Sequence, residues 1–196
     1  MQSTHLTVVA DLENGFGDQP EFIAETIRLV AAAGLVGGSI EDSTGDEENP
    51  IYDFDFAVAR VTAAVGALRA LDFPSTLAAR AENFLHGRAD LDDTIHRLKA
   101  FEKTGADVLF TPGLPNFDAI RMVCASLSRP VNVIANGAFN LILLRHKRLC
   151  CAGCAVGAAQ HGHRGRLLTR ARTSRRRMVA TGFGMWRSGR SGGASV

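Results

Sequence analysis

The chain has 196 residues, of which 46% are hydrophobic and 21% are charged. These proportions are typical of a globular protein, and the length suits one sizeable domain better than two. No run of about 18 apolar residues could span a bilayer and no basic-then-apolar leader opens the chain, so we expect no membrane association and a cytoplasmic location. The cysteines do not have the spacing of a disulfide framework, since Cys124 stands alone and the other three are crowded at Cys150, Cys151 and Cys154.

The net charge of +2 conceals two parts of opposite charge. Residues 1–136 hold all 20 acidic side chains but only 10 of the 22 basic ones, whereas residues 137–196 hold 12 basic and no acidic side chains. Such a division is typical of a basic arm, or of two segments of different origin.

The first predicted element is a strand over Leu6–Ala10 that leads into Asp11, Glu13 and a turn with Gly15 and Gly17. Because strand side chains alternate between faces, Asp11 and Glu13 are expected to share one face at the carboxyl end of the strand. Two carboxylates there suit a hard cation such as Mg²⁺. The alternative is a solvated strand end that runs into a turn.

Helices and strands are then predicted to alternate along the chain. Four more strands are expected at Val36–Ile40, Ser75–Ala79, Asp107–Thr111 and Pro130–Ala135. Four helices are expected: from Pro20 to a stop at Gly34 with Asp18 as cap, from about Asp53 to Leu71, from a cap at Asp90 to Lys103, and from a cap at Asn116 to about Leu127.

This alternation predicts parallel βα units, as in a doubly wound sheet or in part of a (β/α)₈ barrel. Polar residues follow four of the five strands: Asp11 and Glu13, then Glu41, Arg80 and Asn136. Barrel enzymes collect catalytic groups in this way, whereas a dinucleotide fold needs a glycine spacing that is missing here. We therefore predict an α/β fold, an incomplete (β/α)₈ TIM barrel of about five βα units with an irregular basic C-terminal tail.

Five segments in order resemble the isocitrate lyase / phosphoenolpyruvate mutase superfamily. They are VVADLENGFGD at Val8–Asp18, GGSIEDS at Gly37–Ser43, ARAENFLHGR at Ala79–Arg88, GADVLFTPGL at Gly105–Leu114 and RPVNVIANG at Arg129–Gly137. The resemblance implies a barrel that binds Mg²⁺ and a small carboxylic or phosphono acid, in a protein that can associate with copies of itself.

The resemblance implies a role for each candidate site residue. Asp11 would be the direct Mg²⁺ ligand, and Glu13 and Glu41 would bind water molecules that coordinate the metal. The cation would stabilise an enolate oxygen. Arg80 would hold a substrate carboxylate or phosphonate, and the backbone at Gly15 would approach the ligand.

Other readings of the same residues stay open. Arg80 could be a surface ion-pair partner of Glu82, and Glu41 could cap the following turn. Asn83 and Asn136 are either substrate contacts or bonded only to their own loops.

Departures from the family pattern limit the expected chemistry. The loop after the second strand, STGDEENPIYDF, has no cysteine or lysine, so cleavage of the isocitrate type is disfavoured. C–C or P–C bond chemistry on an oxaloacetate-like or phosphonopyruvate-like acid remains. The resemblance also implies that two βα units before the first strand and one strand after Gly137 are missing, so we expect a truncated barrel over 1–137 and a separate basic tail over 138–196.

The tail has three interpretations. Its arginines, such as Arg175–Arg177, could bind nucleic acid, and its cysteines with His161 and His163 could bind zinc. The third interpretation, which we favour, is a disordered or out-of-frame segment. The resulting hypotheses for the whole chain are a Mg²⁺-dependent lyase or mutase, an inactive fragment, or a protein that binds nucleic acid through its tail.

Overall fold

The structure is a computed structural model that describes residues 7–134 and 155–157. Its strands are β1 (Ala10–Asp11), β2 (Gly37–Glu41), β3 (Thr76–Arg80), β4 (Val108–Phe110), β5 (Val131–Ile134) and β6 (Ala155–Gly157). Its helices are α1 (Pro20–Ala32), α2 (Phe54–Arg69), the short 3₁₀ helix η1 (Asn83–His86), α3 (Leu91–Thr104) and α4 (Phe117–Ser126). The predicted alternation of strands and helices is confirmed.

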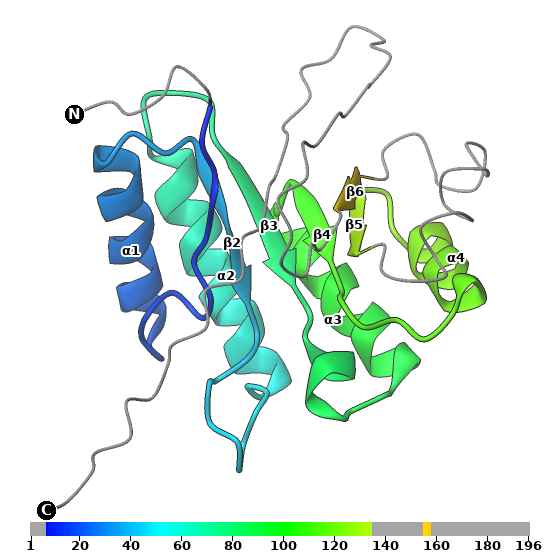
Figure 1. The fold of residues 1–196 in the computed structure, drawn as a ribbon. Helices are drawn as coiled ribbons and strands as arrows, with labels where there is room; N and C mark the ends of the chain where they lie inside the picture. Colours follow the sequence, from blue (N-terminus) through cyan, green and yellow to red (C-terminus); the bar gives the residue numbers. More distant parts are fainter. Residues whose placement is uncertain (1–6, 135–154, 158–196) are drawn as a thin grey trace, which may run out of the picture.

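The six strands form one parallel sheet in the order β1-β2-β3-β4-β5-β6 (Figure 1). A doubly wound sheet reverses its strand order at a switch point, and this sheet does not. Right-handed crossovers between successive neighbours place every connecting helix on the same side, as in the wall of a (β/α)₈ barrel. Consistently, α1 packs on α2 and α2 packs on α3. The fold is thus α/β with a parallel sheet wound as in a barrel.

Local signals set both ends of α3 and the start of α4. The side chains of Asp90 and Asn116 accept hydrogen bonds from the backbone N–H groups of Asp93 and Ala119, so the predicted caps of α3 and α4 are confirmed. Gly105 ends α3 with a positive φ of 101°.

The predicted cap of α1 is wrong. Gln19 occupies that position, without a side-chain cap bond, and the Asp18 carboxylate instead accepts a hydrogen bond from the Tyr52 hydroxyl at 2.6 Å. The hydrogen bond from Tyr52 thus uses the Asp18 carboxylate, which the local sequence predicts to cap α1.

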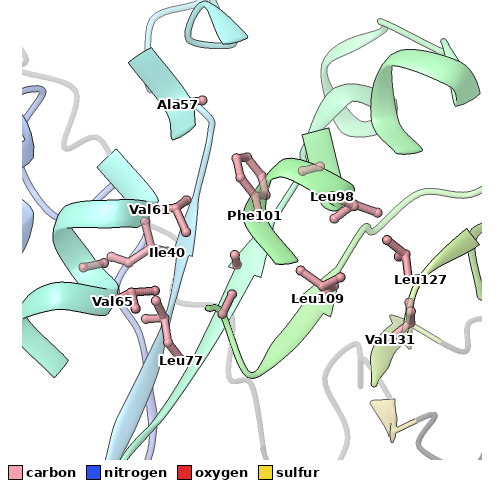
Figure 2. Close-up of a cluster of buried hydrophobic side chains, with 14 of the residues drawn as sticks. Ile40, Ala57, Val61, Val65, Leu77, Leu98, Phe101, Leu109, Leu127 and Val131 are labelled. Atoms are coloured by element: carbon pink, nitrogen blue, oxygen red, sulfur yellow. The ribbon is translucent and has the colours of Figure 1, made fainter. Parts of the chain in front are cut away.

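The hydrophobic core lies between the helices and one face of the sheet. The core row of the sheet consists of side chains in register across four strands: Ile40, Ala79, Leu109 and Val131. Figure 2 shows Val61 and Val65 of α2 beside residues of β2 and β3, and Leu98 and Phe101 of α3 farther along the same layer. Because side chains alternate along a strand, the next residue on each strand faces away from the helices.

Two details of the expected fold are corrected. The first strand ends at Asp11, before Glu13, whose φ of 49° places it in a turn. Within the segment predicted to be an irregular tail, Ala155–Gly157 forms β6 and pairs with β5. The rest of the tail lies outside the described residues. In the part of the chain that is described, no helix is long and apolar enough to cross a membrane.

Candidate active site

A second row of in-register residues lies on the sheet face opposite the core. Glu41 ends β2, Arg80 ends β3 and Phe110 ends β4, and each is paired with the next across the sheet; Phe110 is paired in turn with Asn132 of β5. We call these four residues the site row. Asp11 is paired with Ser39, two residues before Glu41, and therefore lies on the same face.

Arg80 is the centre of the candidate site. Its Nη1 lies 2.5 Å from Asp11 Oδ2, its Nη2 lies 3.2 Å from Glu41 Oε2, and its Nε lies 2.7 Å from Glu82 Oε1. The guanidinium also lies over the Phe110 ring, 5.0 Å from the centroid. One cation thus holds carboxylates from the ends of three adjacent strands.

The Arg80–Glu82 ion pair is formed, but it is not the surface pair that the simpler alternative supposed. The Glu82 side chain is only 3% exposed and that of Arg80 is 11% exposed. Glu82 was missed as a site residue. Its spacing, two residues after an arginine at the end of a buried strand, is the signal that could have identified it.

The site carries more negative than positive charge. Burial is the main cause that raises the pKa of Glu41 to about 8; Arg80 opposes this, and the nearby carboxylates of Glu82, Asp11 and Glu13 add to it. Burial likewise raises the pKa of Glu82. Burial alone would lower the pKa of Arg80, but the carboxylates of Glu82, Glu41 and Asp11 raise it above its usual value. A second cation at this site would relieve the excess negative charge.

The predicted metal residues are only partly brought together. Asp11 Oδ1 accepts hydrogen bonds from the Ser39 hydroxyl and from the Glu13 backbone N–H, both at 3.1 Å. Glu13 is an exposed residue in the turn beyond β1. Its backbone carbonyl accepts a hydrogen bond from the Glu41 N–H at 3.0 Å, and its charge helps to raise the pKa of Glu41. Among the described residues, no group of three or more metal-ligating side chains has the arrangement of a metal site. Asp11 and Glu41 are turned toward Arg80 instead.

Behind the site, a buried ion pair connects α3 to the strand ends. Arg97 Nη1 lies 3.2 Å from Asp42 Oδ2, and the other oxygen, Oδ1, accepts a hydrogen bond from the Glu82 N–H at 2.8 Å. The same Arg97 nitrogen donates to the carbonyl oxygen of Tyr52 at 3.0 Å. The Asp42 side chain is fully buried, and burial is the first cause that raises its pKa to about 6. Arg97 therefore fixes the backbone on which Arg80 and Glu82 stand.

A second buried arginine fixes the loop after β1. Arg60 of α2 donates hydrogen bonds to the backbone carbonyls of Asn14, Gly17 and Asp18, and its guanidinium lies 4.0 Å from the centre of the Tyr52 ring. Both buried arginines were missed from the sequence. Helical spacing could have located Arg60, because it lies between Ala57 and Ala64 on the buried face of α2.

The remaining predicted site residues have mixed positions. Asn83 is buried, and its side-chain nitrogen donates to Asp93 Oδ2 of α3 at 2.6 Å rather than to its own loop. Its side-chain oxygen Oδ1 has no hydrogen-bond partner among the described residues. Gly15 has a φ of 83° and packs on Ile23, which is a structural reason for a glycine there. Asn136 and the tail cysteines and histidines lie outside the described residues. A substrate contact by Gly15, Asn83 or Asn136 stays a prediction.

Comparison with known proteins adds an independent finding to this geometry. The family model described as "Phosphoenolpyruvate phosphomutase" matches residues 1–161. The chain belongs to this family. Its resemblance to the phosphoenolpyruvate mutase / isocitrate lyase superfamily is thereby confirmed.

Solved structures in the family share the fold. A candidate lyase/mutase from Burkholderia cenocepacia J2315 is 60% identical, with a TM-score of 0.66 over 67% of this chain and 47% of that one. An oxaloacetate acetylhydrolase in complex with the product oxalate is 26% identical, with a TM-score of 0.55 over 67% of this chain and 46% of that one.

Among curated proteins, the oxaloacetate decarboxylase of Chromohalobacter salexigens is 26% identical over 163 residues, which are 81% of this chain and 54% of that protein. The chain thus spans about half the length of the curated relatives it matches.

Proposed function

We propose that this chain binds Mg²⁺ at the carboxyl edge of its sheet and acts on a small α-keto or phosphono acid, making or breaking a C–C or P–C bond through an enolate-like intermediate. The observation that carries the proposal is the excess of carboxylates around Arg80. Three acidic side chains contact one guanidinium at the edge where barrel enzymes hold their substrates. A divalent cation would offset that excess.

The chemistry of the available donors fits magnesium. Asp11, Glu13 and Glu41 offer hard oxygen donors, and Mg²⁺ is usually held by one or two carboxylates while it keeps several waters. Asp11 would be the direct ligand, with Glu13 and Glu41 acting through water. When bound, Mg²⁺ supplies a Lewis acid that stabilises negative charge on the substrate oxygen.

The protein's own residues would bind and orient the substrate. In the contacts described, each of the three Arg80 nitrogens has one carboxylate partner. The guanidinium has five N–H groups, so two remain for a substrate carboxylate or phosphonate. Glu82 and the Phe110 ring keep the guanidinium in one orientation. In the metal-free chain Glu41 holds a proton near neutral pH, because its pKa is about 8.

The related proteins support the same substrate class. The oxaloacetate decarboxylase and the oxaloacetate acetylhydrolase named above are both called after a small keto diacid. The loop between β2 and α2 contains no cysteine or lysine, which disfavours cleavage of the isocitrate type.

The test is the thermal stability of the full chain with Mg²⁺ and oxalate, a mimic of the enolate. We expect an increase in melting temperature of several degrees, because saturation at about 100 times Kd contributes about 2.7 kcal/mol. Asp11→Asn should remove the increase. Asp46→Asn, in the exposed loop between β2 and α2, is the matched control and should keep it. If wild-type protein shows no increase, the metal site is not functional in this chain.

A further inference from the structure

Asn132 of β5 is buried, and its side-chain oxygen makes no hydrogen bond to the described part of the chain. The residue is 4% exposed, and among the residues that the structure describes its carboxamide oxygen Oδ1 has no hydrogen-bond partner. Burial of an unpaired amide group is unfavourable, and most buried polar groups in proteins are paired. A buried asparagine without a partner therefore suggests a ligand.

The sheet places this carboxamide on the face of the candidate site. Asn132 is in register with Phe110, and Phe110 is in register with Arg80. Neighbouring residues in register point to the same side of a sheet. The contact between the Arg80 guanidinium and the Phe110 ring confirms that side for the first two. The neighbours of Asn132 in sequence, Val131 and Val133, belong to the core on the helix side.

The position of Asn132 sets the size of ligand that can reach it. Two strand spacings, about 10 Å, separate its backbone from that of Arg80. The Phe110 side chain lies between them, which gives an apolar floor with a polar residue at either end. A two-carbon acid held at Arg80 is too short to reach Asn132. In an extended three- or four-carbon acid held at Arg80, the group at the far end of the ligand lies several ångströms closer to Asn132 than either end of a two-carbon acid does.

We propose that Asn132 binds the end of the substrate that lies away from the metal carboxylates, and that this end is an oxyanion, a carboxylate or a phosphonate. The inference rests on the proposed function. A half-turn of the carboxamide exchanges its oxygen and its NH₂ group, and no hydrogen bond to Oδ1 opposes that turn. The NH₂ group then donates to the oxyanion. Asn132 thus selects acids with a second charged end over shorter ones.

The experiment measures the affinities of three ligands for the full chain by calorimetry at saturating Mg²⁺. Oxalate reports on the metal end alone. 3,3-Difluorooxaloacetate, which has no hydrogen at C3 and cannot enolise there, offers a far carboxylate, and phosphonopyruvate offers a far phosphonate. The variants are Asn132→Leu, which is close in size and cannot hydrogen-bond, Asn132→Asp, and Val133→Ala as a control on the opposite face of the same strand.

We expect Asn132→Leu to weaken at least one of the longer ligands about tenfold or more, while the oxalate affinity changes less than about twofold. Asn132→Asp should weaken that ligand further, because it places two negative charges together. The ligand that responds identifies the far group. Equal loss for all three ligands, no loss for either longer ligand, or retention with Asn132→Asp would each overturn the proposal.

Stability of the ligand-free chain gives a second, independent readout. If the carboxamide serves a ligand, Asn132→Leu melts at or above the wild-type temperature, since it removes an unpaired buried polar group. A drop as large as that of Val133→Ala would assign the residue to the fold and overturn the inference. Failure of wild-type protein to bind oxalate would instead refute the proposed metal site, so the two failures are distinguishable.

Discussion

Gly15 occupies the turn after β1 with a φ of 83°, in the left-handed region that favours glycine. A Cβ atom built at this position would lie 2.7 Å from Cγ1 of Ile23, a fully buried residue of α1, which is too close for two non-bonded carbon atoms. Backbone conformation and packing therefore both require a glycine there. This structural requirement is separate from the ligand contact that the family resemblance implies.

We predict that Gly15→Ala lowers the free energy of unfolding by about 1–3 kcal/mol, because the backbone is strained and Ile23 must move. Gly66→Ala is the matched control. Gly66 lies inside α2, and apart from its chain neighbours and the backbone of its own helix no atom lies within 4 Å of its built Cβ, so alanine there should stabilise by about 0.5–1 kcal/mol. Urea unfolding measures both. Equal effects of the two substitutions would show that the turn conformation of Gly15 does not matter.

At the scale of elements, the ends of β2 and β3 are joined to α3 by the buried pair of Arg97 and Asp42. This pair is not a surface contact that could be lost without consequence, since the two side chains are 6% and 0% exposed. Removal of one partner leaves the other charge buried without compensation. The pair also supports the backbone N–H of Glu82, and through Glu82 the guanidinium of Arg80.

Arg97→Met is therefore expected to lower the free energy of unfolding by about 3–5 kcal/mol, as found when a buried ion pair loses one partner. Arg69→Met, which breaks the more exposed pair with Asp107 at the other end of the sheet, should lower it by about 1 kcal/mol or less. Denaturant titration of both variants makes the comparison. Similar losses for the two would mean that the interior pair is no stronger than a surface pair.

For the molecule as a whole, several buried carboxylates at one edge of the sheet make stability depend on pH. The pKa of Glu41 is raised to about 8 and that of Asp42 to about 6, in both cases chiefly by burial. A carboxyl group whose pKa is higher in the folded state favours folding while it is protonated. That contribution is fully present below the unfolded pKa and is lost as pH rises through the folded pKa.

We predict that the metal-free chain becomes less stable between about pH 5 and pH 8. The decrease above about pH 7 should come mainly from Glu41, because Asp42, whose pKa is about 6, has largely ionised by then. Urea midpoints measured with a chelator across this range test the prediction, with Glu41→Gln as the variant that should flatten the upper part. A profile in Glu41→Gln as steep as in wild-type protein would contradict it.

The amino-acid sequence by itself determined the order of strands and helices, because their signals are local. The apolar periods, the caps at Asp90 and Asn116 and the stop at Gly105 act within a few residues. It also placed Asp11, Glu41 and Arg80 at one edge, because the carboxyl ends of parallel strands meet there whatever the details of packing.

Only the tertiary structure decided how these groups meet. Strand register placed Phe110 and Asn132 in the same row as Arg80. Arg60 and Arg97 are buried and hold the loops of the site in place. Because β1 ends early, Glu13 lies in a turn. Register and burial depend on residues that are far apart along the chain: Arg80 and Phe110 pair across adjacent strands, and so do Phe110 and Asn132. No local pattern in the sequence can specify such pairings, because their free energy comes from contacts that exist only once the sheet has formed.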